Sequence, residues 1–192
     1  MKKIFIDCGT NFGQGLRSIS KLENMDINWD VYSFEANPEL FKEIEKNKHV
    51  RYFNVAVSDY YGFSNFNCEE LIQENNISYN GGGSTLLELD KWNTDKVYGF
   101  KPNYKSYLVP VIDITDFIIN INPQEKSIII KLDIEGSEFK ILPKLEELNL
   151  FKYIKKVYIE FHEHLLSDAP IKGVSYWTEF FTKNNIDYVL WG

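Results

Sequence analysis

The chain has 192 residues, 44% of them hydrophobic and 26% charged, which suits one globular domain with a sizeable core. Its net charge of −7 argues against a nucleic-acid partner, because such proteins present a basic face to phosphates. No apolar run approaches the roughly 20 residues that span a bilayer, and Met1–Asp7 leads directly into a predicted strand without a signal peptide, so we expect a cytoplasmic protein.

Apolar, β-branched segments alternate with helical patterns along most of the chain, which predicts a parallel sheet with helices on both faces. The expected strands cover residues 3–8, 30–35, 51–58, 127–133, 154–161 and 186–191. The expected helices cover residues 13–24, 38–47, 137–149 and 174–184, and Asn37-Pro38-Glu39 is a favourable start for the second. A short helix capped by Asp113 or Thr115 is expected to run through Phe117–Ile119 and to end at Asn122-Pro123.

Residues 60–112 interrupt this alternation. Tyr60–Phe63 predict a turn into an extended piece that ends near Cys68, and the stretch from Gln73 to Gly83 is polar and rich in glycine. A long segment without periodicity inside a compact domain is usually either functional or disordered. We therefore expect a single domain, 1–192, in which this insertion covers the ligand site and contacts the substrate through Ser84 and Thr85, with disorder as the alternative.

The first expected strand leads into a glycine-rich turn, Asp7-Cys-Gly-Thr-Asn-Phe-Gly13. Glycine lets the backbone approach a ligand, and the helix that follows offers unpaired N–H groups. The second strand ends in Glu35, where a carboxylate can hold a ribose diol. The Gly-x-Gly-x-x-Gly fingerprint of dinucleotide sites is absent, whereas Asp7 suits the ammonium of an amino-acid head group. These features favour S-adenosylmethionine over NAD.

The segment Ser127–Glu138 places charged residues at the end of an apolar strand. Buried charges cost several kcal/mol unless they are paired. Strand alternation puts Lys131 and Asp133 on one side, which predicts an ion pair or a shared ligand, while Glu135 and Glu138 also suit a helix start.

A later strand, Tyr153–His164, carries Glu160 and His162 on one side of the sheet. Ligands of open α/β sheets bind outside the carboxyl ends of the strands. We therefore expect one edge of the sheet to bring together the polar residues at these ends, which are Asp7, Glu35, Ser58, Asp133 and His162.

Five blocks of the sequence carry a family resemblance, and they are Phe5–Gly13, Val31–Pro38, Asn54–Gly62, Val111–Phe117 and Ile130–Glu138. In this order they resemble successive motifs of the FkbM-type methyltransferases, which are S-adenosylmethionine-dependent O-methyltransferases that often act on sugars. The resemblance covers residues 3 to 166, and Lys-x-Asp-x-Glu-Gly-x-Glu in the last block is its most specific motif. It implies a Rossmann-like class I methyltransferase fold, with a mostly parallel seven-stranded sheet and helices on both faces.

The same resemblance implies which residues bind the cofactor. The methionine part would be surrounded by residues of the glycine turn, namely Asp7, Gly9, Thr10, Asn11 and Gly13. Glu35 would bind the ribose hydroxyls beside Ala36 and Asn37, and Val57 and Ser58 would flank the adenine. Asp133 is also expected near the cofactor. Cys8, Thr10 and Ala36 depart from the commoner residues of the family without changing these assignments.

Methyl transfer to an alcohol requires a base that removes the hydroxyl proton. Our hypothesis names Asp133 or His162 as this base, with Lys131 orienting a carboxylate. The expected contacts to the substrate are Glu135, Glu138, Glu160 and His162. No metal site is predicted, because a ligand spacing such as His-Glu-x-x-His is absent; an alternative is Mg²⁺ bound by Asp133, Glu135, Glu138 and His162.

The sequence therefore favours an O-methyltransferase that acts on a sugar or glycan, as a monomer or homodimer, with a small natural product or a lipid as other possible acceptors. One alternative is a nicotinamide-dependent reductase, although a hydride-transfer motif such as Tyr-x-x-x-Lys is absent. Another is a catalytically silent module that binds a nucleotide cofactor and serves as a partner subunit.

Overall fold

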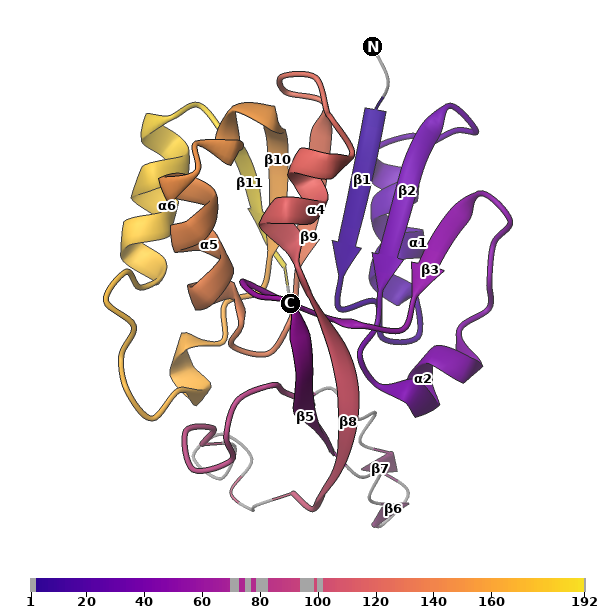
Figure 1. Ribbon diagram of the computed structural model, residues 1–192, viewed down its shortest axis with the longest axis vertical. Coiled ribbons are helices and arrows are strands. Elements are labelled where there is room, and N and C mark those ends of the chain that lie inside the picture. Colours follow the sequence, from indigo (N-terminus) through magenta and orange to yellow (C-terminus); the bar gives the residue numbers. More distant parts are fainter. Residues whose placement is uncertain are drawn as a thin grey trace.

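The centre of the molecule is a six-stranded sheet (Figure 1). A computed structural model describes residues 3–69, 73–74, 77–78, 83–93, 99 and 102–191. The strands of the sheet are β1 (Lys3–Cys8), β2 (Trp29–Phe34), β3 (Val50–Phe53), β9 (Ile128–Leu132), β10 (Ile154–Ile159) and β11 (Asp187–Leu190). Their order is β11-β10-β9-β1-β2-β3, and each pair of neighbours is parallel. The predicted Rossmann-like α/β class is confirmed, with six strands among the described residues instead of seven.

The helices begin and end close to the predicted positions. They are α1 (Gln14–Leu22), α2 (Pro38–Glu43), α4 (Ile114–Asn120), α5 (Glu138–Glu147) and α6 (Val174–Lys183), with 3-10 turns η1 (Leu150–Tyr153) and η2 (Glu163–Leu165). The Asn37 side chain caps α2 as expected, but the helix stops before Ile44, whose backbone is extended. Asp113 caps α4 by accepting a hydrogen bond from the backbone N–H of Thr115.

Side-chain alternation explains why the strands are almost wholly apolar. Ile128 and Ile130 of β9 pack in the larger core, which contains residues of α4, α5 and α6. Ile129 between them packs in the second core, which contains Leu16 and Ile19 of α1. Figure 1 shows α4, α5 and α6 in front of the sheet and α1 behind it. A parallel strand that is covered on both faces needs apolar residues at successive positions.

The predicted strand 51–58 is wrong, because the structure divides it between two sheets. After β3, the Asn54 side chain donates hydrogen bonds to the carbonyls of Glu35 and Ala36 and turns the chain. The next strand, β4 (Ala56–Ser58), then belongs to a second sheet.

The second sheet occupies much of the 60–112 insertion. Its order is β4-β8-β5, in which β8 (Tyr104–Asp113) is parallel to β4 and antiparallel to β5 (Gly62–Glu69). In Figure 1 the β5–β8 pair lies beyond the carboxyl ends of β1 and β2. Two short strands, β6 (Gln73–Glu74) and β7 (Ile77–Ser78), pair with each other. The rest of the insertion between residues 70 and 101, apart from 83–93 and Gly99, lies outside the described residues.

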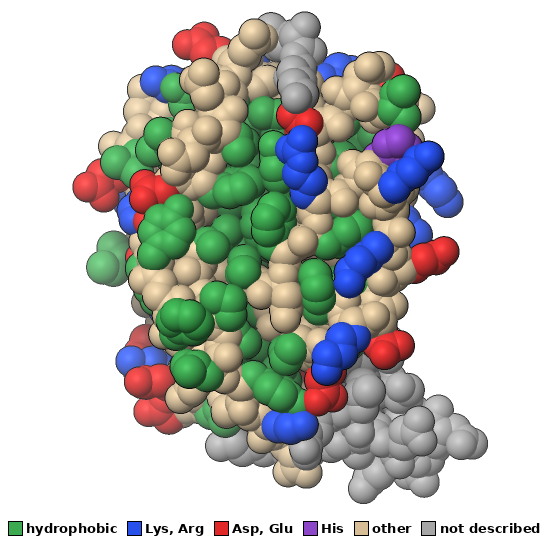
Figure 2. Space-filling model, turned by 45° about the vertical axis from the view of Figure 1, so that its right-hand side comes forward, with side chains coloured by type: hydrophobic (Ala, Val, Ile, Leu, Met, Phe, Trp, Pro, Cys, Tyr) green, Lys and Arg blue, Asp and Glu red, His purple; other side chains and the backbone are tan. Residues whose placement is uncertain are grey.

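The molecular surface mixes apolar and charged side chains. Figure 2 shows one face on which apolar side chains occupy the centre and charges of both signs lie around them. Phe63 and Leu108 of the second sheet are among the exposed large apolar residues. No helix in the described part of the chain has the length and apolar character needed to cross a membrane.

Candidate active site

The strand order reverses between β1 and β9, and charged side chains meet at the carboxyl ends of these two strands. Asp7 of β1 lies opposite Lys131 of β9 in the sheet register. Lys131 Nζ donates to Asp133 Oδ2 and to the carbonyl of Gly9, both at 2.8 Å, and lies 3.7 Å from Asp7 Oδ1. The predicted ion pair between Lys131 and Asp133 is confirmed.

This ion-pair group is deeply buried. The Lys131 side chain is 2% exposed and that of Asp7 is fully covered. Burial lowers the pKa of Lys131, but Asp133 and Asp7 outweigh it and raise that pKa above its ordinary value, so the lysine stays charged. Thr10 Oγ1 donates to Asp7 Oδ2 at 2.9 Å, and Asp7 Oδ1 has no hydrogen-bond partner among the described residues.

Gly9 lets the turns after β1 and β9 touch. Its backbone has φ +81°, and a Cβ built at this position would lie 1.8 Å from the carbonyl oxygen of Asp133. The same two turns are joined by a 3.2 Å hydrogen bond from the Asp133 N–H to the Cys8 carbonyl. A side chain at position 9 would therefore separate the two strand ends that form the site.

We expect Gly9→Ala to lower the free energy of unfolding by about 3 kcal/mol or more, because backbone strain of about 1–2 kcal/mol adds to a clash with rigid backbone. Gly13→Ala is the matched control: its φ is also +81°, but its Cβ would approach only the movable guanidinium of Arg17, at 3.1 Å. Gly13→Ala should cost about 1–2 kcal/mol. Urea denaturation followed by circular dichroism measures both losses, and equal losses would contradict this explanation.

A first pocket, mostly apolar, opens beside the end of β2. Its free space is about 550 Å³ with the open mouth included. Ala36, Val57 and Leu86 contribute apolar wall, and Glu35 contributes a carboxylate. Pockets with apolar walls and a few polar groups are typical of small-molecule and cofactor sites.

The Glu35 carboxylate is fixed by backbone groups on both sides. Its Oε2 accepts from the N–H of Asn11 and its Oε1 from the N–H of Asn37, each at 2.7 Å. Burial raises the pKa of Glu35 to about 7, against the lowering effect of these two bonds. Because an ionised carboxylate can accept about four hydrogen bonds, two acceptor positions remain for ligand hydroxyls.

A second, acidic pocket adjoins the first at the carboxyl end of β9. Its free space is about 860 Å³, again including the mouth, and its walls include Lys131, Glu160, His162 and Trp191. Both pockets share Gly9, Asn11, Asp133 and Glu135. Asp133 and Glu135 therefore stand where a ligand in one pocket would meet a ligand in the other.

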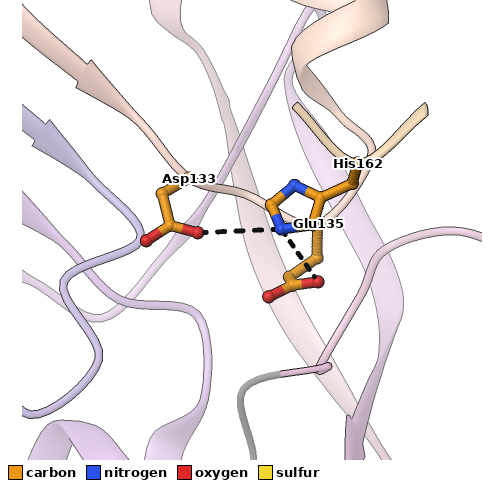
Figure 3. A group of neighbouring side chains, drawn as sticks. All are labelled: Asp133, Glu135 and His162. Atoms are coloured by element: carbon orange, nitrogen blue, oxygen red, sulfur yellow. Dashed lines mark ion pairs between the residues drawn. The ribbon is translucent and has the colours of Figure 1, made fainter. Parts of the chain in front are cut away.

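His162 lines the acidic pocket, and its ring lies next to Asp133 and Glu135 (Figure 3). Its Nε2 is 3.4 Å from Glu135 Oε2, 3.8 Å from Glu160 Oε1 and 4.0 Å from Asp133 Oδ1. On the other side of the ring, Nδ1 lies 3.2 Å from Glu138 Oε1. Glu160 and His162 are thus on the same side of the sheet, as predicted.

The surrounding carboxylates decide the protonation of His162. Burial lowers the pKa of the imidazole, but the nearby charges of Glu138 and Glu135 outweigh burial and raise the pKa to about 10. With a pKa of about 10, the His162 imidazole carries a proton on both ring nitrogens at neutral pH. It therefore stabilises negative charge and is not ready to accept another proton.

The turn that carries Glu135 is held in an uncommon conformation. Glu135 has φ +52°, which a non-glycine residue adopts only when its surroundings hold it there. Glu138 accepts hydrogen bonds from the N–H groups of Ile134 and Gly136, at 2.7 and 2.9 Å. Thr85 Oγ1 donates to the Glu135 carbonyl at 2.7 Å. These contacts aim the Glu135 carboxylate at His162.

Comparison with known protein families matches residues 7–185 to the methyltransferase FkbM domain. The chain belongs to the FkbM methyltransferase family. Neither the curated proteins nor the solved structures contain a match. The matched region of this FkbM methyltransferase contains both turns of the site and all the residues that line the two pockets except Trp191.

Several residues of this FkbM methyltransferase that are predicted to contact ligands are buried and hold neighbouring groups in place. Glu138 and Thr85 have no exposed surface, and their polar atoms hold the Glu135 turn. Thr10 holds Asp7, and Asp7 itself lies beneath the pocket surface. Glu138 lies six residues after the end of β9 and is the first residue of α5, which is the helix-start position that the sequence also suggested for it.

Some of the residues predicted to bind the cofactor line the two pockets, and others do not. Gly9, Asn11, Glu35, Ala36 and Val57 line the first pocket, as does Ser84 of the insertion. Neither pocket is lined by three other predicted residues, Asn37, Gly13 and Ser58. Asn37 caps α2, and Gly13 directly precedes α1. The Ser58 hydroxyl donates a hydrogen bond to the Asp59 carboxylate. Phe34, Leu40 and Leu86 line the first pocket and were not predicted, because apolar wall residues resemble core residues in sequence.

Proposed function

We propose that this FkbM methyltransferase uses S-adenosylmethionine to methylate a hydroxyl group of a sugar or glycan. The observation that carries the proposal is the junction of two unlike pockets. The apolar pocket with Glu35 meets the acidic pocket with His162 at Asp133 and Glu135. A donor and an acceptor bound in these pockets would meet at that junction.

The first pocket suits the nucleoside part of this cofactor. Ala36, Val57 and Leu86 offer apolar wall to an adenine ring, and the free acceptor positions of Glu35 suit ribose hydroxyls. Gly9 has no side chain, so a ligand can approach its backbone where the two pockets join. When bound, S-adenosylmethionine supplies a methyl group that is already activated on a positively charged sulfur. The excess of carboxylates at the junction favours a cation there.

The acidic pocket suits an acceptor with several hydroxyl groups. Glu135 and Glu160 provide carboxylate oxygens that can accept from a diol, and Trp191 in the same wall offers an aromatic face. We assign the base to Asp133, because His162 already holds its proton. Lys131 fixes Asp133 through Oδ2 at 2.8 Å and leaves Oδ1 directed toward His162.

Isothermal calorimetry with S-adenosylmethionine, S-adenosylhomocysteine and NAD tests the choice of cofactor. We expect binding of the first two and no binding of NAD, and release of S-adenosylhomocysteine when the enzyme is offered a panel of free and nucleotide-linked sugars. His162→Gln should keep cofactor affinity within about threefold and lose most turnover, because His162 lines only the acceptor pocket. Binding of NAD alone would contradict a methyltransferase and favour a reductase.

A further inference from the structure

We infer that Asp133, Glu135 and His162 form a binding site for a divalent cation of the Mg²⁺ or Mn²⁺ type. One ligand atom from each of the three residues lies within 4.8 Å of the others. Figure 3 shows Asp133 and Glu135, from the turn after β9, converging with His162, from the turn after β10. Two carboxylate oxygens and one imidazole nitrogen are a suitable donor set for Mn²⁺, which accepts both kinds of ligand.

The groups behind the three ligands are arranged as in metal sites. A histidine that binds a metal almost always has its other ring nitrogen held by a carboxylate or carbonyl. Here Glu138 holds Nδ1 of His162, while Nε2 makes no hydrogen bond to any described residue, although the side chain is 95% covered. Lys131 holds Oδ2 of Asp133 and leaves Oδ1 on the side of His162. His162 and Asp133 thus each have one atom held by a neighbouring side chain and the other atom directed toward the proposed ion, while Thr85 holds the backbone of Glu135.

The distances require only small adjustments to coordinate an ion. Neighbouring ligands of an octahedral ion at about 2.1 Å lie about 3 Å apart. His162 Nε2 is 3.4 Å from Glu135 Oε2 and 4.0 Å from Asp133 Oδ1. Side-chain shifts smaller than about 1 Å would complete the contacts, and the acidic pocket leaves further coordination positions open to water or to an acceptor.

Charge balance also favours a divalent ion. Around this point five carboxylates, those of Asp7, Asp133, Glu135, Glu138 and Glu160, lie near two cationic side chains of the described part of the chain, those of Lys131 and His162. Buried carboxylates that lack a partner are costly. A single divalent ion would compensate several of them at once, and its binding would release the proton from Nε2.

The cation would also have a task in the reaction. This part of the inference rests on the proposed function, because an acceptor hydroxyl that reaches the ion would lose its proton more readily. Asp133 would then act as a ligand, the cation would lower the pKa of the hydroxyl, and the released proton would pass to Glu160 in the wall of the same pocket. Cation binding itself can be measured without cofactor, acceptor or turnover.

Electron paramagnetic resonance of Mn²⁺ tests the site, because bound Mn²⁺ loses the six-line signal of the free ion. We expect the metal-stripped wild-type protein to bind one Mn²⁺, and Glu135→Gln and Asp133→Asn to weaken binding by a factor of about 10 or more. Glu147→Gln makes the same chemical change on the exposed end of α5 and should leave binding unchanged. Circular dichroism confirms that each variant is folded.

The outcomes separate this inference from the proposed function. Absence of Mn²⁺ binding, or binding that survives both substitutions, would overturn the cation site. Full methyl transfer after treatment with a chelator would likewise overturn it, while leaving the methyltransferase intact. Conversely, Mn²⁺ binding that depends on Glu135 in a protein that binds no S-adenosylmethionine would support the site and contradict the proposed cofactor.

Discussion

Replacing Lys131 by methionine is expected to lower the free energy of unfolding by about 3–5 kcal/mol at pH 7. Methionine has a similar length but no charge, so Asp7 and Asp133 would lose the cation that lies 3.7 and 2.8 Å from them. The Gly9 carbonyl would lose its hydrogen bond as well. Urea denaturation measures the loss.

Two further variants show whether the cause is the unpaired charge. Lys140→Met makes the same change at an exposed position of α5 and should alter stability by less than about 0.5 kcal/mol. Asp7→Asn combined with Lys131→Met should lose less than the sum of the single losses, because the double variant removes both charges of one pair. Strict additivity would show that the pair is not coupled, and a loss below about 1 kcal/mol for Lys131→Met alone would contradict the expectation.

Replacing Glu35 by glutamine is expected to weaken binding of S-adenosylhomocysteine by about 10–100-fold at pH 8. The amide has nearly the same shape, but its NH₂ group would face an N–H of Asn11 or Asn37 that the carboxylate now accepts. It would also offer fewer acceptor positions to ribose hydroxyls. Glu43→Gln, at an exposed position of α2, is the control and should bind normally. Calorimetry compares the three proteins.

The raised pKa of Glu35 makes this interaction depend on pH. Since hydroxyls donate to the ionised carboxylate, affinity of the wild type should fall as pH drops below about 7, where Glu35 becomes protonated, and should change less in Glu35→Gln. Stability of the free protein should respond in the opposite sense. Between pH 4.5 and about 7 the folded state keeps a proton that the unfolded chain releases, so the contribution of Glu35 to stability declines as pH rises through this window.

The sequence predicted the part of the fold that follows strand and helix periodicity. β1, β2, β9 and the helices around them occur where apolar periodicity placed them, since their residues are buried on the expected faces. The long strand β8 was missed, because apart from Val109, Val111 and Asp113 most of its residues are exposed or half-buried and show no alternation. Its partner β5 lies about 40 residues away, and pairing over that separation leaves no local signal.

The sequence also predicted part of the candidate site. Strand ends indicated that Asp133 and His162 would meet, because carboxyl ends of parallel strands share an edge. The sequence could not distinguish Glu135, which faces the pocket, from Glu138, which lies beneath it. That difference arises from the left-handed backbone at Glu135, whose carbonyl accepts a hydrogen bond from Thr85 in a distant segment.

The hydroxyl of Thr85 has a consequence for engineering and for divergence among relatives. It donates a hydrogen bond from a segment of the insertion to the backbone carbonyl of Glu135, 50 positions later in the chain. Exchange of the insertion between two enzymes, made to alter acceptor preference, would therefore also change the anchor of a carboxylate in the other half of the chain. A graft that lacks a hydroxyl at this point would bring new specificity together with a misaligned Glu135.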